Sequence, residues 1–243
     1  MADSDSCIEI CTAPSPTATV IWLHGLGADG NDFAPIVPEL QLPDALSIRF
    51  LFPHAPVRPV TCNGGYEMRA WYDIFSLEDF AQEDERGLVE SQEYIEGLIK
   101  SENQRGIPTQ RIVLLGFSQG GGVALHAGLR HSQRLAGIGG LSTYLPLRDT
   151  PTDTYSQANR DTSIFMAHGR QDPVVRYEHG ETSRQILNNM GHSINWNSYD
   201  MEHNVCPEEI NDISKWLVNC LDSTSDNNSY SHSENSSGNI LNN

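Results

Sequence analysis

Apolar residues follow two patterns along the chain, one of strand length and one of helical period. Short runs that are almost wholly apolar have the length and composition of buried strands. In residues 84–102, Leu88, Ile95 and Ile99 instead recur at intervals of seven and four, which favours an amphipathic helix. The strand-like runs are 18–24, 46–53, 111–117, 134–142, 162–169 and 192–199. The other helix-like segments follow Ser118 through about Arg130, span about 176–190, and run from Pro207 to Leu221.

Strand-like and helix-like segments alternate over most of the chain. This order predicts an α/β fold with a mostly parallel central sheet and helices on both of its faces. Ligands of such sheets bind beyond the carboxyl ends of the strands. We therefore expect the functional residues to follow strands directly.

The two ends of the chain differ in composition from the middle. The last residues are rich in Ser and Asn and nearly free of large apolar side chains, so they cannot bury enough surface to offset their ordering entropy. The chain is thus expected to have a flexible N-terminal segment with room for a short first strand (1–17), one folded domain (18–221) and a disordered tail (222–243).

Charge and cysteine content exclude several classes of function. The formal net charge is −17, from 32 acidic and 15 basic residues, whereas nucleic acid and anionic membranes require basic patches. No apolar run is long enough to span a membrane, and the N-terminus lacks a secretory signal pattern, which predicts a cytoplasmic protein without stable membrane insertion. The cysteines have no metal-ligand spacing and are expected to be reduced thiols: Cys7, Cys11, Cys62, Cys206 and Cys220.

The sequence Gly116-Phe117-Ser118-Gln119-Gly120 is a G-x-S-x-G motif between a predicted strand and a predicted helix. A tight strand-to-helix turn exposes the serine hydroxyl, and glycines two residues before and after it let the strand and helix approach closely. A bare G-x-S-x-G also arises by chance, so its place between strand and helix carries the argument. We predict Ser118 to be a nucleophile.

A serine nucleophile needs a base and an acid, which in this topology follow it in the order Ser, Asp or Glu, His. Asp172 comes shortly after the strand-like run 162–169, and His203 comes after the last strand and just before the last helix. The carboxyl ends of parallel strands meet at one edge of the sheet. We therefore predict that Ser118, Asp172 and His203 form a catalytic triad.

Other histidines and acidic residues are less well placed. His168 follows its strand directly but precedes Asp172 in the chain. Asp200 shares a loop with His203, where we expect it to face solvent. The remaining candidates lie on the helix after Ser118, before a strand, or in a Pro/Thr-rich loop: His126, His131, His192, Asp149 and Asp153.

The loop His24-Gly25-Leu26-Gly27 follows the first long strand. Such a loop can supply one backbone N–H to a developing oxyanion, together with the residue after the nucleophile. The predicted donors are the backbone amides of Leu26 and Gln119. A plain glycine turn is the alternative interpretation of this loop.

The motifs HGLGADGNDF, APVRPVTCNGGYEMRAWYDI, GFSQGG, HGRQDPVV and HNVCPEEI together resemble those of the acyl-protein thioesterase and small carboxylesterase group of α/β-hydrolases, with the bacterial-type carboxylesterases nearest. The resemblance covers about residues 18–221. It implies an α/β-hydrolase fold without a large cap domain, and the same triad and oxyanion donors. It further implies that the segment Trp71, Tyr72 and Asp73 borders the substrate groove, although composition alone favours a core or rim position for Trp71. The predicted substrate-binding residues are Trp71 and Val174. Glu202 stands where members of the group commonly have glycine.

From the motifs and this resemblance we expect a serine hydrolase that cleaves short- to medium-chain carboxylic esters through an acyl-enzyme, with no metal and no cofactor. One alternative is an acyl-protein thioesterase or lysophospholipase acting on long acyl chains. Another is a hydrolase-fold protein that binds ligands without turnover, against which an intact triad argues. The expected partner is a small-molecule ester or acyl-thioester. A homodimer is suggested by the resemblance alone and not by any pattern in the sequence.

Overall fold

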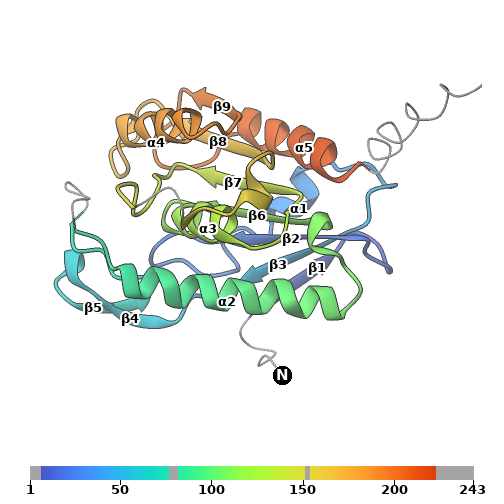
Figure 1. Ribbon diagram of the computed structural model, residues 1–243, viewed down its shortest axis with the longest axis horizontal. Coiled ribbons are helices and arrows are strands. Elements are labelled where there is room, and N and C mark those ends of the chain that lie inside the picture. The colour runs from blue at the N-terminus through green and yellow to red at the C-terminus, as the bar shows by residue number, and fades with distance from the viewer. Residues whose placement is uncertain (1–6, 77–81, 151–153, 223–243) are drawn as a thin grey trace, which may run out of the picture.

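The computed structural model describes residues 7–76, 82–150 and 154–222. A seven-stranded sheet has the order β1-β3-β2-β6-β7-β8-β9, and every neighbouring pair is parallel except β1 with β3. Figure 1 shows the sheet crossing the molecule, with the helices packed around it. The predicted α/β fold with a mostly parallel sheet is confirmed. Its strands are β1 Cys7–Cys11, β2 Ala18–Leu23, β3 Ile48–Pro53, β6 Ile112–Phe117, β7 Gly137–Leu141, β8 Ser163–Gly169 and β9 Ile194–Tyr199.

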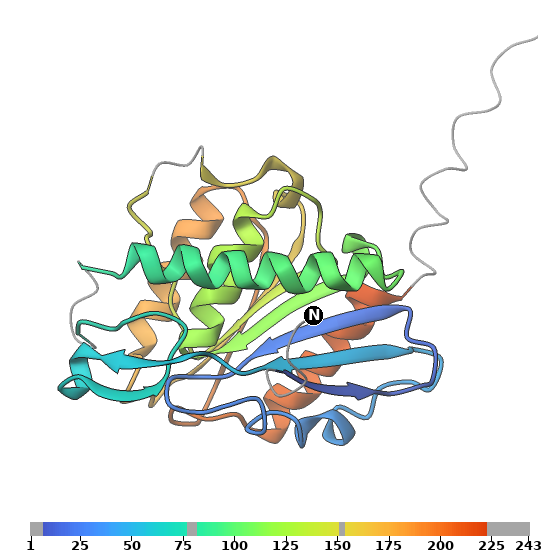
Figure 2. The ribbon, with the colours of Figure 1, turned by 90° about the horizontal axis from the view of Figure 1, so that it is seen from below.

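Helices cover both faces of this sheet. One face packs against α2, α3 and α4 through a core that includes Ile95, Val123 and Leu187, and the other packs against α1 and α5 through a core that includes Ile36 and Ile213. Figure 2 shows these two layers on opposite sides of the strands. The α-helices are α1 Ile36–Glu39, α2 Glu85–Gln104, α3 Gln119–Arg130, α4 Tyr177–Asn189 and α5 Pro207–Leu221. Single 3-10 turns are η1 Thr61–Asn63, η2 Thr109–Arg111 and η4 Gln157–Asn159.

The central strands read as apolar runs because both of their faces are buried. Every residue of β2, β3 and β7 is buried. The edge strand β9 is mostly half-buried, and apolar and polar residues alternate along it. At the N-terminal end, Cys7–Cys11 of the predicted flexible segment pairs with β3 as the other edge strand. The predicted tail lies outside the described residues except for Asp222.

A two-stranded antiparallel sheet, formed by β4 Val57–Val60 and β5 Tyr66–Arg69, was not predicted from the sequence. Pro59 within β4 argues against a strand, because proline cannot donate a ladder hydrogen bond. The Asn63-Gly64 pair is a turn signal that could have revealed the hairpin. Gly64 and Gly65 indeed have φ of 67° and 79°, which side chains disfavour.

A buried carboxylate ties α2 to the sheet. Glu102 is 1% exposed, and its Oε2 accepts hydrogen bonds from Thr19 Oγ1 at 2.5 Å and Arg49 Nη1 at 2.6 Å. Its Oε1 accepts a bond from Arg105 at 3.0 Å. Removing Glu102 would leave the buried guanidinium of Arg49 without this partner.

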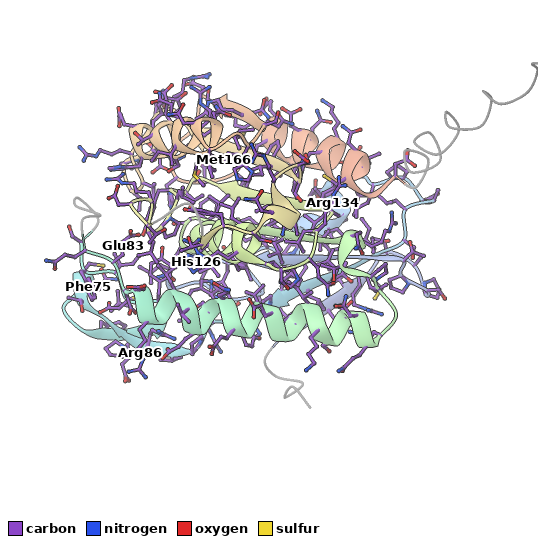
Figure 3. The ribbon with its side chains drawn as sticks, viewed as in Figure 1. Phe75, Glu83, Arg86, His126, Arg134 and Met166 are labelled. Carbon is purple, nitrogen blue, oxygen red and sulfur yellow. The ribbon has the colours of Figure 1, made fainter. Side chains whose placement is uncertain are left out.

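We expect Glu102→Ala to lower the free energy of unfolding by about 3–5 kcal/mol, because removing one partner of a buried ion pair is strongly destabilising. Within the described ranges, Arg49 keeps only its 3.2 Å ionic contact with the less buried Glu9. Urea unfolding measures this loss. Arg86→Ala is the matched control: Arg86 pairs with Glu90 on the same helix but points into solvent (Figure 3). That exposed pair should be worth no more than about 0.5 kcal/mol. Equal losses in the two variants would contradict the assigned role of Glu102.

Glu209 lies fully buried in the first turn of α5. Burial raises its pKa to about 8, despite the nearby backbone N–H of Cys206. A carboxyl group whose pKa is raised on folding contributes its full stability below the unfolded pKa, and loses it as pH rises toward the folded value. We therefore expect the melting temperature of the wild type to fall relative to that of Glu209→Gln between pH 5 and pH 8. If the melting temperatures of the wild type and of Glu209→Gln instead changed by the same amount over that range, the pKa of Glu209 would not be raised on folding.

Candidate active site

Ser118 occupies a strained turn between β6 and α3. Its backbone has φ 53° and ψ −121°, a left-handed region that residues with a side chain rarely adopt. A Cβ atom on Gly116 would lie 2.2 Å from Gly120 O, and one on Gly120 would lie 2.5 Å from Leu23 O. The two glycines thus permit the close approach of strand and helix that the motif predicts. Thr143 Oγ1 donates a hydrogen bond of 2.7 Å to Ser118 O and holds the turn in place.

Three side chains from separate loops form a hydrogen-bonded series at the carboxyl edge of the sheet. Ser118 Oγ lies 2.9 Å from His203 Nε2, and His203 Nδ1 lies 2.7 Å from Asp172 Oδ2. Because a carboxylate only accepts, Nδ1–H donates to Asp172, and Nε2 is left to accept the serine proton. The Phe117 ring packs 4.8 Å from the imidazole and limits its rotation. The structure therefore brings Ser118, Asp172 and His203 together.

The environment of Asp172 keeps its carboxyl group ionised. Burial by itself raises the pKa of Asp172, but hydrogen bonds from His168 and His203 oppose it, and the pKa falls well below its usual range. The backbone N–H groups of Val174 and Val175 add bonds of 2.8 and 2.9 Å to Oδ1. A permanently charged acceptor thus faces the imidazole.

The predicted oxyanion donors lie on either side of Ser118. Gln119 is the first residue of α3, where a backbone N–H has no acceptor within the helix. Gly25 packs against the serine: a Cβ atom placed on it would lie 3.4 Å from Ser118 Cβ. Leu26 follows directly, in a turn where Gly27 has φ 76°. The role of both amides in binding an oxyanion stays a prediction.

The two predicted substrate contacts have different surroundings. Trp71 has 0% exposed surface, and its Nε1 donates a 2.9 Å bond to His24 O. This burial fits the composition-based interpretation of a core aromatic. A role of Trp71 in substrate binding stays a prediction. Val174 is 39% exposed and, with His203, lines a hollow of about 600 Å³. Its contact with a substrate stays a prediction.

The side chain of Gln119 binds the backbone of a neighbouring segment, a contact that the sequence did not indicate. Its Oε1 accepts a 2.9 Å hydrogen bond from the backbone N–H of Trp71, and its Nε2 donates a 2.7 Å bond to the backbone carbonyl oxygen of Tyr72. The residue after the nucleophile thus anchors the segment 71–72 beside the site. The motif marks Gln119 for its backbone amide only, and no local signal reveals the partners of its side chain.

Asp153 lies outside the described residues, and the other competing candidates have surroundings that differ from those of the triad. Asp200 is exposed and accepts a 2.7 Å bond from Gln171, as expected for a solvent-facing acid. His126 is buried on α3, as Figure 3 shows, and burial together with Arg130 lowers its pKa to about 3. Glu202 has an exposed side chain and a backbone outside the left-handed region, so the turn before His203 accommodates it without glycine. Among these candidates, His168 contacts the triad directly, with its Nε2 3.5 Å from Asp172 Oδ2.

Within residues 7–76, 82–150 and 154–222, no three His, Cys, Asp or Glu side chains gather closely enough to hold a metal ion. In the same ranges, no helix is both long and apolar enough to cross a bilayer.

Comparison with known proteins gives a consistent assignment. A family model described as Phospholipase/Carboxylesterase matches residues 6–221. Acyl-protein thioesterase 1 of Neurospora crassa is 42% identical over 219 residues, covering 86% of this chain and 89% of its own. The crystal structure of Zea mays acyl-protein thioesterase 2 is 29% identical with a TM-score of 0.78, covering 88% of this chain and 99% of its own. Bacillus cereus carboxylesterase, at 17% identity and a TM-score of 0.70, covers 89% of this chain and 96% of its own and shares the fold.

Proposed function

The chain belongs to the phospholipase/carboxylesterase family of α/β-hydrolases, and we propose that it hydrolyses acyl esters and thioesters. In this proposal Ser118 is the nucleophile, His203 is the general base, and the Asp172 carboxylate supports His203. The observation that carries this proposal is the 2.9 Å separation of Ser118 Oγ and His203 Nε2. That distance lies within the range required for direct proton transfer from a nucleophile to its base.

The reaction follows from this geometry. Ser118 Oγ attacks the acyl carbonyl while His203 Nε2 takes the hydroxyl proton, and Asp172 stabilises the imidazolium. The backbone amides of Leu26 and Gln119 bind the oxyanion of the tetrahedral intermediate. His203 then gives the proton to the departing alcohol or thiol, which leaves an acyl-enzyme. Water then attacks the acyl-enzyme while His203 takes its proton. His203 returns that proton to Ser118 Oγ as the acyl–serine bond breaks, which releases the carboxylic acid and restores the free serine.

Two substrate classes suit this site. Short- to medium-chain carboxylic esters are the class expected from the sequence. Long-chain acyl groups on protein thiols are the second class, and the specific observation in its favour is the 42% identity to a protein called acyl-protein thioesterase 1. A lysophospholipase would share the long-chain requirement. The predicted cytoplasmic location and the homodimer stay predictions.

A series of acyl chain lengths separates the two classes. We expect measurable kcat/KM for p-nitrophenyl esters and for matched S-acyl peptides from two to eight carbons, because the acyl-transfer chemistry is shared. A kcat/KM that rises further through sixteen carbons on the S-acyl peptide assigns the thioesterase class. A loss of about tenfold or more beyond eight carbons on both scaffolds assigns the short-chain esterase class. Failure to hydrolyse either scaffold at any length would overturn the proposed function itself.

A further inference from the structure

His168 is a buried histidine that the proposed acyl-transfer steps do not use. It is the second-last residue of β8 and has 0% exposed surface. Its Nε2 lies 2.7 Å from the carbonyl oxygen of Val175 and 3.5 Å from Asp172 Oδ2. The ring therefore contacts the loop that carries Asp172.

The contacts of the ring define its proton. A carbonyl oxygen only accepts, so Nε2 carries a hydrogen and donates it to Val175. Nδ1 has no hydrogen-bond partner within the described part of the chain, and a Cβ atom on Gly180 would lie 2.3 Å from it. The rings of Tyr177 and Trp196 close the pocket, with centroids at 6.0 and 6.4 Å. A second ring proton, on Nδ1, would be buried without an acceptor.

The Val175 peptide links this ring to the Asp172 carboxylate. Val175 accepts from His168 through its carbonyl group and donates its own N–H to Asp172 Oδ1 at 2.9 Å. His168 Nε2 also lies 3.5 Å from Oδ2, the oxygen that His203 binds. One ring therefore contacts both the loop backbone and the carboxylate that the loop carries.

We infer that His168 is a positioning residue that holds Asp172 in register with His203. The inference rests on the proposed function, because it concerns the same triad. Without this ring, the buried Val175 carbonyl loses its donor and the Asp172 loop is free to shift. A displacement of about 1 Å between reacting groups can cost about 100-fold in rate.

The test compares donors of different reach at position 168. The Nε2 amide of a glutamine extends about as far as the Nε2 of histidine, an asparagine is too short to reach Val175, and a leucine cannot donate. We expect His168→Leu and His168→Asn to lower kcat by about 10- to 100-fold with little change in KM, and His168→Gln to stay within about fivefold of wild type. His126→Leu, the same substitution at a buried histidine on α3, is the matched control and should leave kcat unchanged.

The pH profile separates positioning from a merely structural role. Asp172, Tyr177 and His179 are the titratable groups that face the His168 ring. A displaced Asp172 stabilises the His203 imidazolium less, so the acid limb of kcat should move to lower pH in His168→Leu and His168→Asn but not in His168→Gln. Lower melting temperatures with an unmoved limb and unchanged kcat per folded molecule would overturn the inference. If His168→Leu does not fold, the comparison of kcat and of the acid limb between His168→Asn and His168→Gln tests the inference by the same criteria.

The same experiment includes Ser118→Ala. An inactive Ser118→Ala beside fully active His168 variants would refute the positioning role and leave the proposed function intact. Retained activity in Ser118→Ala would refute the proposed function directly.

Discussion

Ser118→Ala is expected to reduce kcat/KM for p-nitrophenyl esters by about 10⁴-fold or more, because the reaction loses its only route to an acyl-enzyme. Ser118 Oγ is the atom that His203 Nε2 faces at 2.9 Å, and its backbone is held at φ 53° by the glycine-flanked turn. Alanine at the same φ removes the hydroxyl and changes little else. Steady-state kinetics on purified protein, corrected for folded fraction by circular dichroism, measure the loss.

Ser193→Ala provides the matched control. Ser193 is exposed and precedes β9, at the edge of the sheet opposite the site. The same removal of a hydroxyl there should leave kcat/KM unchanged. If Ser118→Ala kept more than about one tenth of wild-type activity while remaining folded, another nucleophile would have to be sought.

Asp172→Asn is expected to lower kcat by about 10⁴-fold while leaving the fold intact. The asparagine amide can donate to His203 Nδ1 and so favours the tautomer with hydrogen on Nε2. That tautomer cannot accept the proton of Ser118. The exposed Asp200 in the neighbouring loop serves as control, and Asp200→Asn should remain within about twofold of wild type.

The pH dependence of the wild type follows from the same carboxylate. Because the pKa of Asp172 is lowered on folding, its contribution to stability is present above the unfolded pKa and is lost only as pH falls through the still lower folded value. The protein should therefore stay folded, with Asp172 ionised, between pH 7 and pH 5. Unfolding in that range, followed by circular dichroism, would contradict an ionised, tightly held Asp172.

The topology of the site was predictable because it depends on chain order more than on packing. Ser118, Asp172 and His203 each follow a strand of a parallel sheet, so their convergence at one edge follows from the alternation of strands and helices. The bounds of α5 agree with the sequence for a similar reason, since Pro207 suits a first helical turn.

Features that depend on tertiary packing were not predictable. Trp71 lies in the core because α2 covers it, with Ser91 Oγ donating to its carbonyl oxygen and the Tyr94 ring 6.2 Å away. No periodicity within 55–74 distinguishes that burial from a place on a groove. The contact between His168 and the Asp172 loop likewise depends on how the loop folds back over the end of β8.

Covalent capture of the nucleophile tests the central claim most directly. Incubation with a fluorophosphonate, followed by intact mass and peptide mass spectrometry, should show one adduct per chain, located on Ser118. His203→Ala should slow this labelling by about 10³-fold or more, since the base no longer accepts the serine proton. An unlabelled wild-type protein, or an adduct on a residue other than Ser118, would contradict the account.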